Sequence, residues 1–129
     1  MITKTDIEEY IAEKSSVFEN QKPIFEIMMM ENKGDNEIVY PTGKPSGFPD
    51  TGITDTVGFY YELEKSIEAL HCNACDLRET VYDAAFVLCR FPGLYDCVPS
   101  EGRMYFIWDK EKEGYFEAEE PELFKHVAY

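Results

Sequence analysis

The residues best suited to chemistry in this sequence are His71, Cys72 and Cys75, which lie together in one short segment. A Cys-x-x-Cys pair supplies half of many zinc sites, and a neighbouring histidine adds a third potential ligand. The remaining cysteines, Cys89 and Cys97, are separated by seven residues, which does not match the second half of a zinc ribbon or finger. Two interpretations stay open: a metal site at His71, Cys72 and Cys75 completed by a distant ligand, or small, partly buried cysteines without a ligand.

Other kinds of catalytic site have little support. A thioredoxin-like cysteine pair should lie at the N-terminus of a helix, where the thiol pKa falls, but this pair follows about ten residues of predicted helix. The sequence has two histidines, His71 and His126, and neither has a nucleophile next to it. It has no Gly-x-Ser-x-Gly motif and no glycine-rich phosphate-binding motif. We therefore favour a protein without catalysis and without a cofactor, and a small enzyme or metal-binding protein with a site around His71, Cys72 and Cys75 is the alternative.

The composition bounds the class of protein and its partners. With 129 residues, 44% of them hydrophobic, the chain fits a single folded domain spanning residues 1–129. The net charge of −14 opposes direct binding to nucleic acid or to anionic membranes, and favours either high solubility or a basic protein partner. Residues 1–10 are too charged for the core of a signal peptide, and no later run is as long as a membrane span. We expect a cytoplasmic protein with reduced cysteines.

The N-terminal part of the chain predicts a helix followed by a hairpin. Thr5 and Glu8 have the spacing of a capping box, which predicts a helix over Asp6–Phe18. The segment Ile24–Met30 is apolar on both faces and predicts a strand, although Glu26 within it suggests a place at an edge or flank of the sheet. A turn-forming run then leads to Glu37–Tyr40, which we expect to return as the second strand of the hairpin.

The stretch Pro41–Gly52 alternates prolines with glycines and is predicted to be irregular throughout. Long ordered loops of this kind are often functional, but they also occur as plain solvated connections. The sequence leaves both interpretations open.

The centre of the chain predicts a strand–helix–strand unit. The strand ends in the apolar run Val57–Tyr61, a helix begins near Leu63, and the apolar run Ala84–Phe91 predicts a central strand. We expect the helix to break near Asn73, which tolerates a left-handed conformation, with Asp76 capping a second short helix. An unbroken helix is the alternative.

The C-terminal part predicts a second hairpin and completes the fold. Its strands are Arg103–Trp108 and Gly114–Ala118, and Glu120–Glu122 resembles the start of a helix. Together these elements predict an α+β two-layer fold, with a mixed sheet of four to five strands, a β-α-β crossover helix and an N-terminal helix. One helix layer covers one face of such a sheet. The other face requires the N-terminal helix, the C-terminal segment or a second copy, and we predict a homodimer.

The acidic C-terminal hairpin offers a candidate surface for a partner. Aromatic side chains ringed by charge are typical of an interface core and its rim. This pattern favours a protein-binding or regulatory module, such as an inhibitor or immunity-type protein that occupies a basic partner. In the alternative interpretation the aromatics fill the core of the sheet and the charges only keep the protein in solution. The candidate partner-binding residues are Tyr105, Trp108, Tyr115, Glu117 and Glu119.

Part of the chain resembles a known group of proteins. The segments Val57-Gly58-Phe59-Tyr60, Cys75-Asp76-Leu77, Ala85-Phe86-Val87 and Gly93-Leu94-Tyr95, with Trp108, carry the resemblance. The chain is similar over about Thr56–His126 to small uncharacterised proteins of Firmicutes bacteria and their phages. The resemblance implies a bacterial or phage source, and it implies no activity and no site residues.

Overall fold

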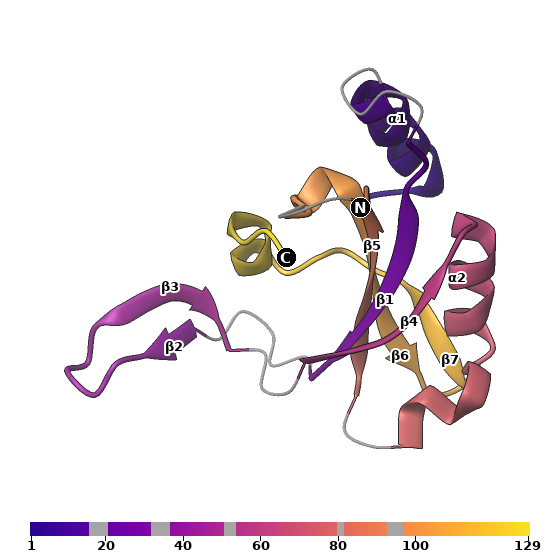
Figure 1. The fold of residues 1–129 in the computed structure, drawn as a ribbon. Helices are drawn as coiled ribbons and strands as arrows, with labels where there is room; N and C mark the ends of the chain where they lie inside the picture. Colours follow the sequence, from indigo (N-terminus) through magenta and orange to yellow (C-terminus); the bar gives the residue numbers. More distant parts are fainter. Residues whose placement is uncertain (16–20, 32–36, 51–53, 80–81, 93–96) are drawn as a thin grey trace.

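The computed structural model describes residues 1–15, 21–31, 37–50, 54–79, 82–92 and 97–129. Five strands of these residues form one sheet, and two further strands form a hairpin that projects away from it (Figure 1). The predicted turn at residues 32–36 and the predicted end of the first helix lie outside the described residues. The elements are α1 (Lys4–Ser15), β1 (Ile24–Met30), β2 (Glu37–Val39), β3 (Pro45–Pro49), β4 (Thr54–Tyr60), α2 (Leu63–His71), η1 (Ala74–Glu79), β5 (Ala84–Arg90), η2 (Ser100–Gly102), β6 (Arg103–Asp109), β7 (Gly114–Glu117) and η3 (Glu122–His126).

The sheet has the strand order β4-β1-β5-β6-β7, and each neighbouring pair is antiparallel. The α+β fold with an N-terminal helix is confirmed. β4 and β5 run parallel to each other and are joined by α2, so the crossover unit is present, but β1 lies between its two strands. The predicted mixed sheet is therefore wrong, because an apolar β1 separates the two parallel strands.

β1 has the predicted bounds but a more central place than its acidic residue suggested. Glu26 is 6% exposed and lies inside the sheet, which corrects the expectation of an edge or flank. Its carboxylate accepts hydrogen bonds from the Thr56 hydroxyl, at 2.7 Å, and from Arg90 Nε. These partners offset the cost of removing a charged group from water.

The β2–β3 hairpin corrects two sequence predictions. β2 pairs with β3, not with β1, so Glu37–Tyr40 does not form the expected hairpin with Ile24–Met30. β3 itself lies inside the stretch that was predicted to be irregular. Gly43, whose φ of 82° is left-handed, closes the turn by donating its N–H to the Tyr40 carbonyl at 2.8 Å. The prolines of β3 stand at its two ends, where a missing N–H disrupts the pairing least.

Both predicted helices are present, but the capping box of α1 is not the predicted one. Thr3 and Asp6, not Thr5 and Glu8, form the capping box of α1: the Thr3 N–H donates to Asp6 Oδ2 at 2.7 Å, and the Asp6 N–H donates to the Thr3 hydroxyl at 3.3 Å. These hydrogen bonds hold the pKa of Asp6 below its usual value. No helix in the described ranges is long and apolar enough to cross a membrane.

The predicted break after α2 is confirmed. Asn73 has a left-handed φ of 51°, and its side-chain oxygen accepts the Arg78 N–H at 2.9 Å. Asp76 does not act as the expected cap, since it is itself left-handed with a φ of 54° and its N–H bonds to the Asn73 carbonyl. Asn73 therefore both ends α2 and organises the next turn.

The two faces of the sheet carry separate hydrophobic cores. α2 lies on one side of the sheet and the C-terminal segment with η3 lies on the other (Figure 1). Phe124 and Val98, both fully buried, belong to the second core, and Val98 and Tyr129 exchange backbone hydrogen bonds of 2.7 and 3.1 Å. The C-terminal segment thus covers the face that prompted the homodimer prediction.

Candidate functional site

Exposed apolar side chains gather in one part of the described chain. Seven of the nine large hydrophobic residues that are exposed there fall between residues 38 and 61. A typical globular domain scatters such residues singly, so their concentration marks a candidate interaction surface. We call this set the hairpin–β4 surface; it has two parts, one on the β2–β3 hairpin and one on and just after β4, and its residues are Ile38, Val39, Tyr40, Phe48, Val57, Phe59 and Tyr61.

The β2–β3 hairpin contributes the first half of this surface. Val39 is 60% exposed and Phe48 is 55% exposed, because the hairpin projects beyond the sheet (Figure 1). A hairpin of two strands is marginally stable in water unless a hydrophobic face packs against something. Pro49 at its base is buried, whereas its outer apolar residues are open to a partner.

β4 contributes the second half. It is the terminal strand of the sheet, and no residue of β4, all seven of which are described, is buried. Val57 lies at a register shift in the pairing with β1, and the Phe59 side chain is 58% exposed. A Cβ on Gly58 would meet no atom within 4 Å, so the face of β4 is open at this residue.

The sequence around β4 is rich in acidic residues. Between Lys44 and Lys65 the chain contains four acidic residues, Asp50, Asp55, Glu62 and Glu64, and no basic residue. Glu64 forms an ion pair with Lys4 across the start of α2. Asp55 on β4 is exposed and accepts a hydrogen bond from the Tyr82 hydroxyl. The hairpin–β4 surface therefore combines apolar side chains with net negative charge.

The aromatic residues of the C-terminal hairpin are mostly part of the cores. Tyr105 is 4% exposed and Tyr115 is fully buried, which corrects the expectation that they face a partner. Trp108 is half-buried: it packs edge-on against Tyr115, and the Arg78 guanidinium lies 5.2 Å from its ring centre. The Tyr115 hydroxyl donates to the Tyr82 carbonyl at 2.8 Å, and burial raises the pKa of Tyr115 to about 12.

The two acidic candidates of that hairpin are exposed but already paired. Glu117 contacts His71 Nε2, and Glu119 binds both the Met1 amino group at 2.6 Å and Lys125 at 2.8 Å. These two cations hold the pKa of Glu119 down at about 2, with the Lys125 hydrogen bond the largest cause. Glu119 offers no free charge to a partner without breaking its ion pairs with Met1 and Lys125, and the Glu117 carboxylate is already engaged by the His71 ring nitrogen.

The structure separates the three predicted metal candidates by environment. The His71 ring stacks on Phe116 with 4.6 Å between ring centres, and its Nε2 faces Glu117. Cys72 and Cys75 are free and exposed, which corrects the expectation that they are partly buried. Within the described part of the chain, no three His, Cys, Asp or Glu side chains converge as a metal-binding group.

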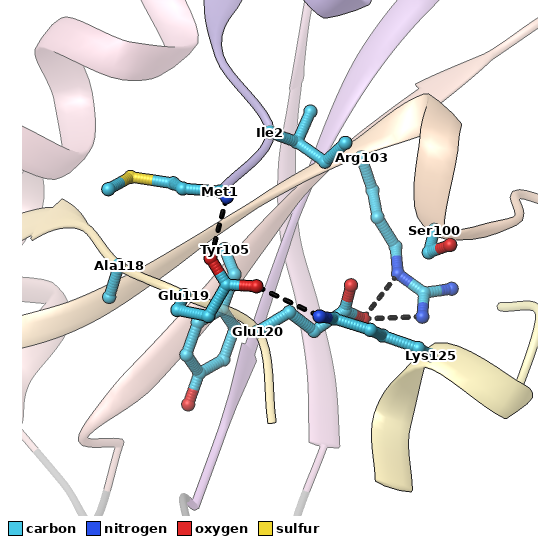
Figure 2. Close-up of a pocket in the computed structure, with 9 residues that line it drawn as sticks. All are labelled: Met1, Ile2, Ser100, Arg103, Tyr105, Ala118, Glu119, Glu120 and Lys125. Atoms are coloured by element: carbon cyan, nitrogen blue, oxygen red, sulfur yellow. Dashed lines mark hydrogen bonds and ion pairs between the residues drawn. The ribbon is translucent and has the colours of Figure 1, made fainter. Parts of the chain in front are cut away.

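A pocket of about 260 Å³ lies where the N-terminus meets the C-terminal segment (Figure 2). Figure 2 shows its charged groups turned toward one another: Arg103 meets Glu120, and Glu119 lies between Met1 and Lys125. Each charged group that lines the pocket thus already has a partner of opposite sign. The pocket joins two ends of the fold, and its charged groups are engaged with one another.

The hairpin–β4 surface was missed at the sequence level, although part of its signal was present. The turn Pro-Thr-Gly-Lys after Tyr40 is a hairpin signal, and apolar residues flank it on both sides. The density of proline and glycine concealed a short strand. The apolar run of β4 is typical of a buried strand and does not reveal an edge position.

Comparisons with known proteins add no relationship. No protein-family model matches the chain, and neither the curated proteins nor the solved structures contain a significant match.

Proposed function

We propose that this chain is a protein-binding module, of the inhibitor or immunity type, that engages a basic partner through the hairpin–β4 surface and performs no catalysis. The observation that carries the proposal is the concentration of seven exposed large hydrophobic residues between residues 38 and 61. Large apolar side chains that stay exposed on a folded protein are typical of sites where another molecule docks. The C-terminal hairpin, which the sequence favoured, has Tyr105, Phe106 and Tyr115 in the cores, and none of its residues belongs to this surface.

The charge supports a basic partner. The chain carries 26 acidic and 12 basic residues, and the segment between Lys44 and Lys65 has four acidic residues and no basic one. Complementary potentials steer association and exclude partners of like charge. The same charge opposes a second copy of this chain, so a homodimer is the competing occupant and not the preferred one.

The metal-site or enzyme alternative at His71, Cys72 and Cys75 has less support. The His71 ring nitrogen is directed at Glu117, and both thiols are exposed. Metal analysis of protein purified without a histidine tag tests this alternative: a stoichiometric zinc that is lost in Cys75→Ala would establish it.

Capture of partners from the source cell tests the proposed function. Wild type, the hairpin variant Tyr40→Ser/Phe48→Ser and the control Ile107→Ser are compared, since Ile107 is 39% exposed on β6 and lies outside the surface. We expect a stoichiometric basic protein with wild type and with Ile107→Ser, and its loss with the hairpin variant. If no stoichiometric protein is captured, or if both variants capture it equally, the proposal is wrong. Circular dichroism verifies that all three proteins are folded.

A further inference from the structure

Within the hairpin–β4 surface, the free edge of β4 offers backbone N–H and C=O groups that can bind a partner strand. In the described chain β4 pairs with β1 alone, and no backbone hydrogen bond to any other element involves residues 54–60. An unpaired strand edge presents a row of N–H and C=O groups that another extended chain can match. We infer that this edge accepts an extended basic segment of a partner protein as an additional strand; the inference rests on the proposed function and names the site and the chemistry of the partner.

The side chains along the edge define what the added strand must carry. Asp55 lies on the α2 side of the sheet, opposite Met29 of β1, and Phe59 lies on the other side, opposite Glu26. In an added strand, successive side chains point to opposite faces. A segment that alternates basic with apolar residues therefore places its basic side chains toward Asp55 and its apolar ones toward Phe59.

The charge selects this occupant over a second copy. In two-fold antiparallel self-pairing, each copy would bring its own Asp55 onto the shared edge and would carry Glu62 just beyond the end of β4. Like charges directly opposite one another destabilise a strand pair. The two copies would also each carry a net charge of −14. A strand with lysine or arginine replaces this repulsion by attraction.

The edge has few of the devices that block strand addition. It contains no proline and no lysine, and it is seven residues long. The register shift at Val57 divides it into two short runs, so we expect an added strand to pair most strongly with one of them. Backbone hydrogen bonds supply affinity in this mode of recognition, and the alternating side chains supply specificity.

Peptide binding to the full chain tests the inference. The probe is a fluorescent peptide as long as β4 that alternates lysine with valine, and binding is followed by fluorescence anisotropy. The first control peptide alternates glutamate with valine, and the second keeps lysine and valine but carries N-methyl groups on the valine nitrogens, which removes backbone donors. We expect the first probe to bind at least about tenfold more tightly than either control.

Protein variants locate the peptide. Val57→Lys places a cation on the edge, and Ile107→Lys is the matched control because the two side chains are 42% and 39% exposed. We expect Val57→Lys to weaken binding about tenfold or more and Ile107→Lys to change it less than about threefold. Hydrogen exchange should show new protection of the amides of residues 54–60 in the bound state, and no change at residues 114–117.

Three results would overturn the inference. If the N-methylated peptide binds as tightly as the first probe, charge attraction alone explains the binding. If hydrogen-exchange protection appears outside β4, the segment binds at another place on the protein. A wild-type dimer that Val57→Lys converts to a monomer would mean that a second copy occupies the edge. In each case the capture experiment with the hairpin variant still decides the proposed function separately.

Discussion

β4 and β7 are the two edge strands of one sheet, and they differ in length and burial. β4 has seven residues, none of which is buried, and it carries exposed apolar side chains. β7 has four residues, and the first two, Gly114 and Tyr115, are buried. The His71 carbonyl at the end of α2 lies against Gly114, and Glu117 is paired with His71.

The β7 edge is protected in the ways that are common in natural sheets, and the β4 edge is not. Natural sheets protect their edges by short strands, by charge or by covering segments. β7 combines a short strand with contact from α2, and the chain that follows it folds back over the second face of the sheet. β4, by contrast, is long and pairs with β1 alone among the described residues, which is why we assign recognition to β4.

Removing the link that holds the segment after β7 should have the largest effect. Arg103 is 1% exposed; its guanidinium binds Glu120 and donates to the carbonyls of Val98, Phe124 and Val127. Arg103→Met leaves a buried carboxylate and three carbonyls without these donors, so we expect a loss of about 4 kcal/mol in the free energy of unfolding. Urea denaturation measures it.

A matched ion pair near the β4 side provides the control. Arg90, which is 26% exposed in its side chain, binds Glu26, so Arg90→Met removes a pair that is partly solvated. We expect about half the loss, near 2 kcal/mol. Equal losses for Arg90→Met and Arg103→Met would contradict the idea that the β7 side is the more tightly closed.

The glycines of the two edge strands give the second prediction. A Cβ on Gly114 would lie 2.0 Å from the His71 carbonyl oxygen, whereas a Cβ on Gly58 would meet nothing within 4 Å. Gly114→Ala forces α2 and β7 apart, and we expect it to cost about 3 kcal/mol. Gly58→Ala should be neutral or stabilising by about 0.5 kcal/mol, because it reduces the entropy of the unfolded chain. Thermal and urea denaturation of both variants test the difference, and similar values for the two would refute it.

The buried tyrosine of β7 gives the third prediction. Because burial raises the pKa of Tyr115 to about 12, the folded state keeps a proton that the unfolded state releases near pH 10. The stability from this proton is present below pH 10 and is lost as the pH rises toward 12. We expect wild type to lose about 2 kcal/mol more than Tyr115→Phe over that range. Urea curves at stepped alkaline pH check it, and parallel losses in the two proteins would be the contrary result.

A control on the open edge accompanies this measurement. Tyr61, just after β4, is 89% exposed, so Tyr61→Phe should change the free energy of unfolding at neutral pH by less than about 0.5 kcal/mol. Tyr115→Phe should cost about 1 kcal/mol at the same pH, because the Tyr82 carbonyl loses a donor at 2.8 Å.

Local patterns in the sequence predicted the elements that depend on local chemistry. The bounds of β1, the start of α2 and the break at Asn73 follow from apolar runs and from a residue that tolerates positive φ. Strand order could not be predicted, because an apolar strand can lie beside several partners and only tertiary packing chooses among them. β1 separates β4 from β5 for that reason, and β4 became an edge despite its apolar sequence.

The candidate site was harder to predict than the fold. In the sequence, Tyr105 and Tyr115 occupy strand positions that fit either a buried core or an exposed interface. The packing of the C-terminal segment and of α2 against the sheet decides between these two environments. The exposed residues of the hairpin, by contrast, are conspicuous only when β3 is known to exist. Its short run of Pro, Ser, Gly and Phe gives no periodic signal.

The smallest predicted effect is also the most direct comparison of the two edges in binding. Charge reversal should slow association with a basic partner where the charge is free to steer it, and have less effect where an internal ion pair already neutralises it. Asp55 on β4 is exposed and bonds to a neutral hydroxyl, whereas Glu119, just after β7, is paired with the Met1 amino group and Lys125. We expect Asp55→Lys to lower the on-rate of the lysine–valine peptide about threefold at low salt, and Glu119→Lys to lower it by less than half of that factor. Stopped-flow fluorescence at low and physiological salt measures both rates.

The difference between the on-rates of the two variants should shrink as salt rises, because exposed charges are screened beyond about 8 Å at physiological ionic strength. Equal slowing by the two reversals would mean that the overall charge of the protein, and not the open edge, governs the encounter.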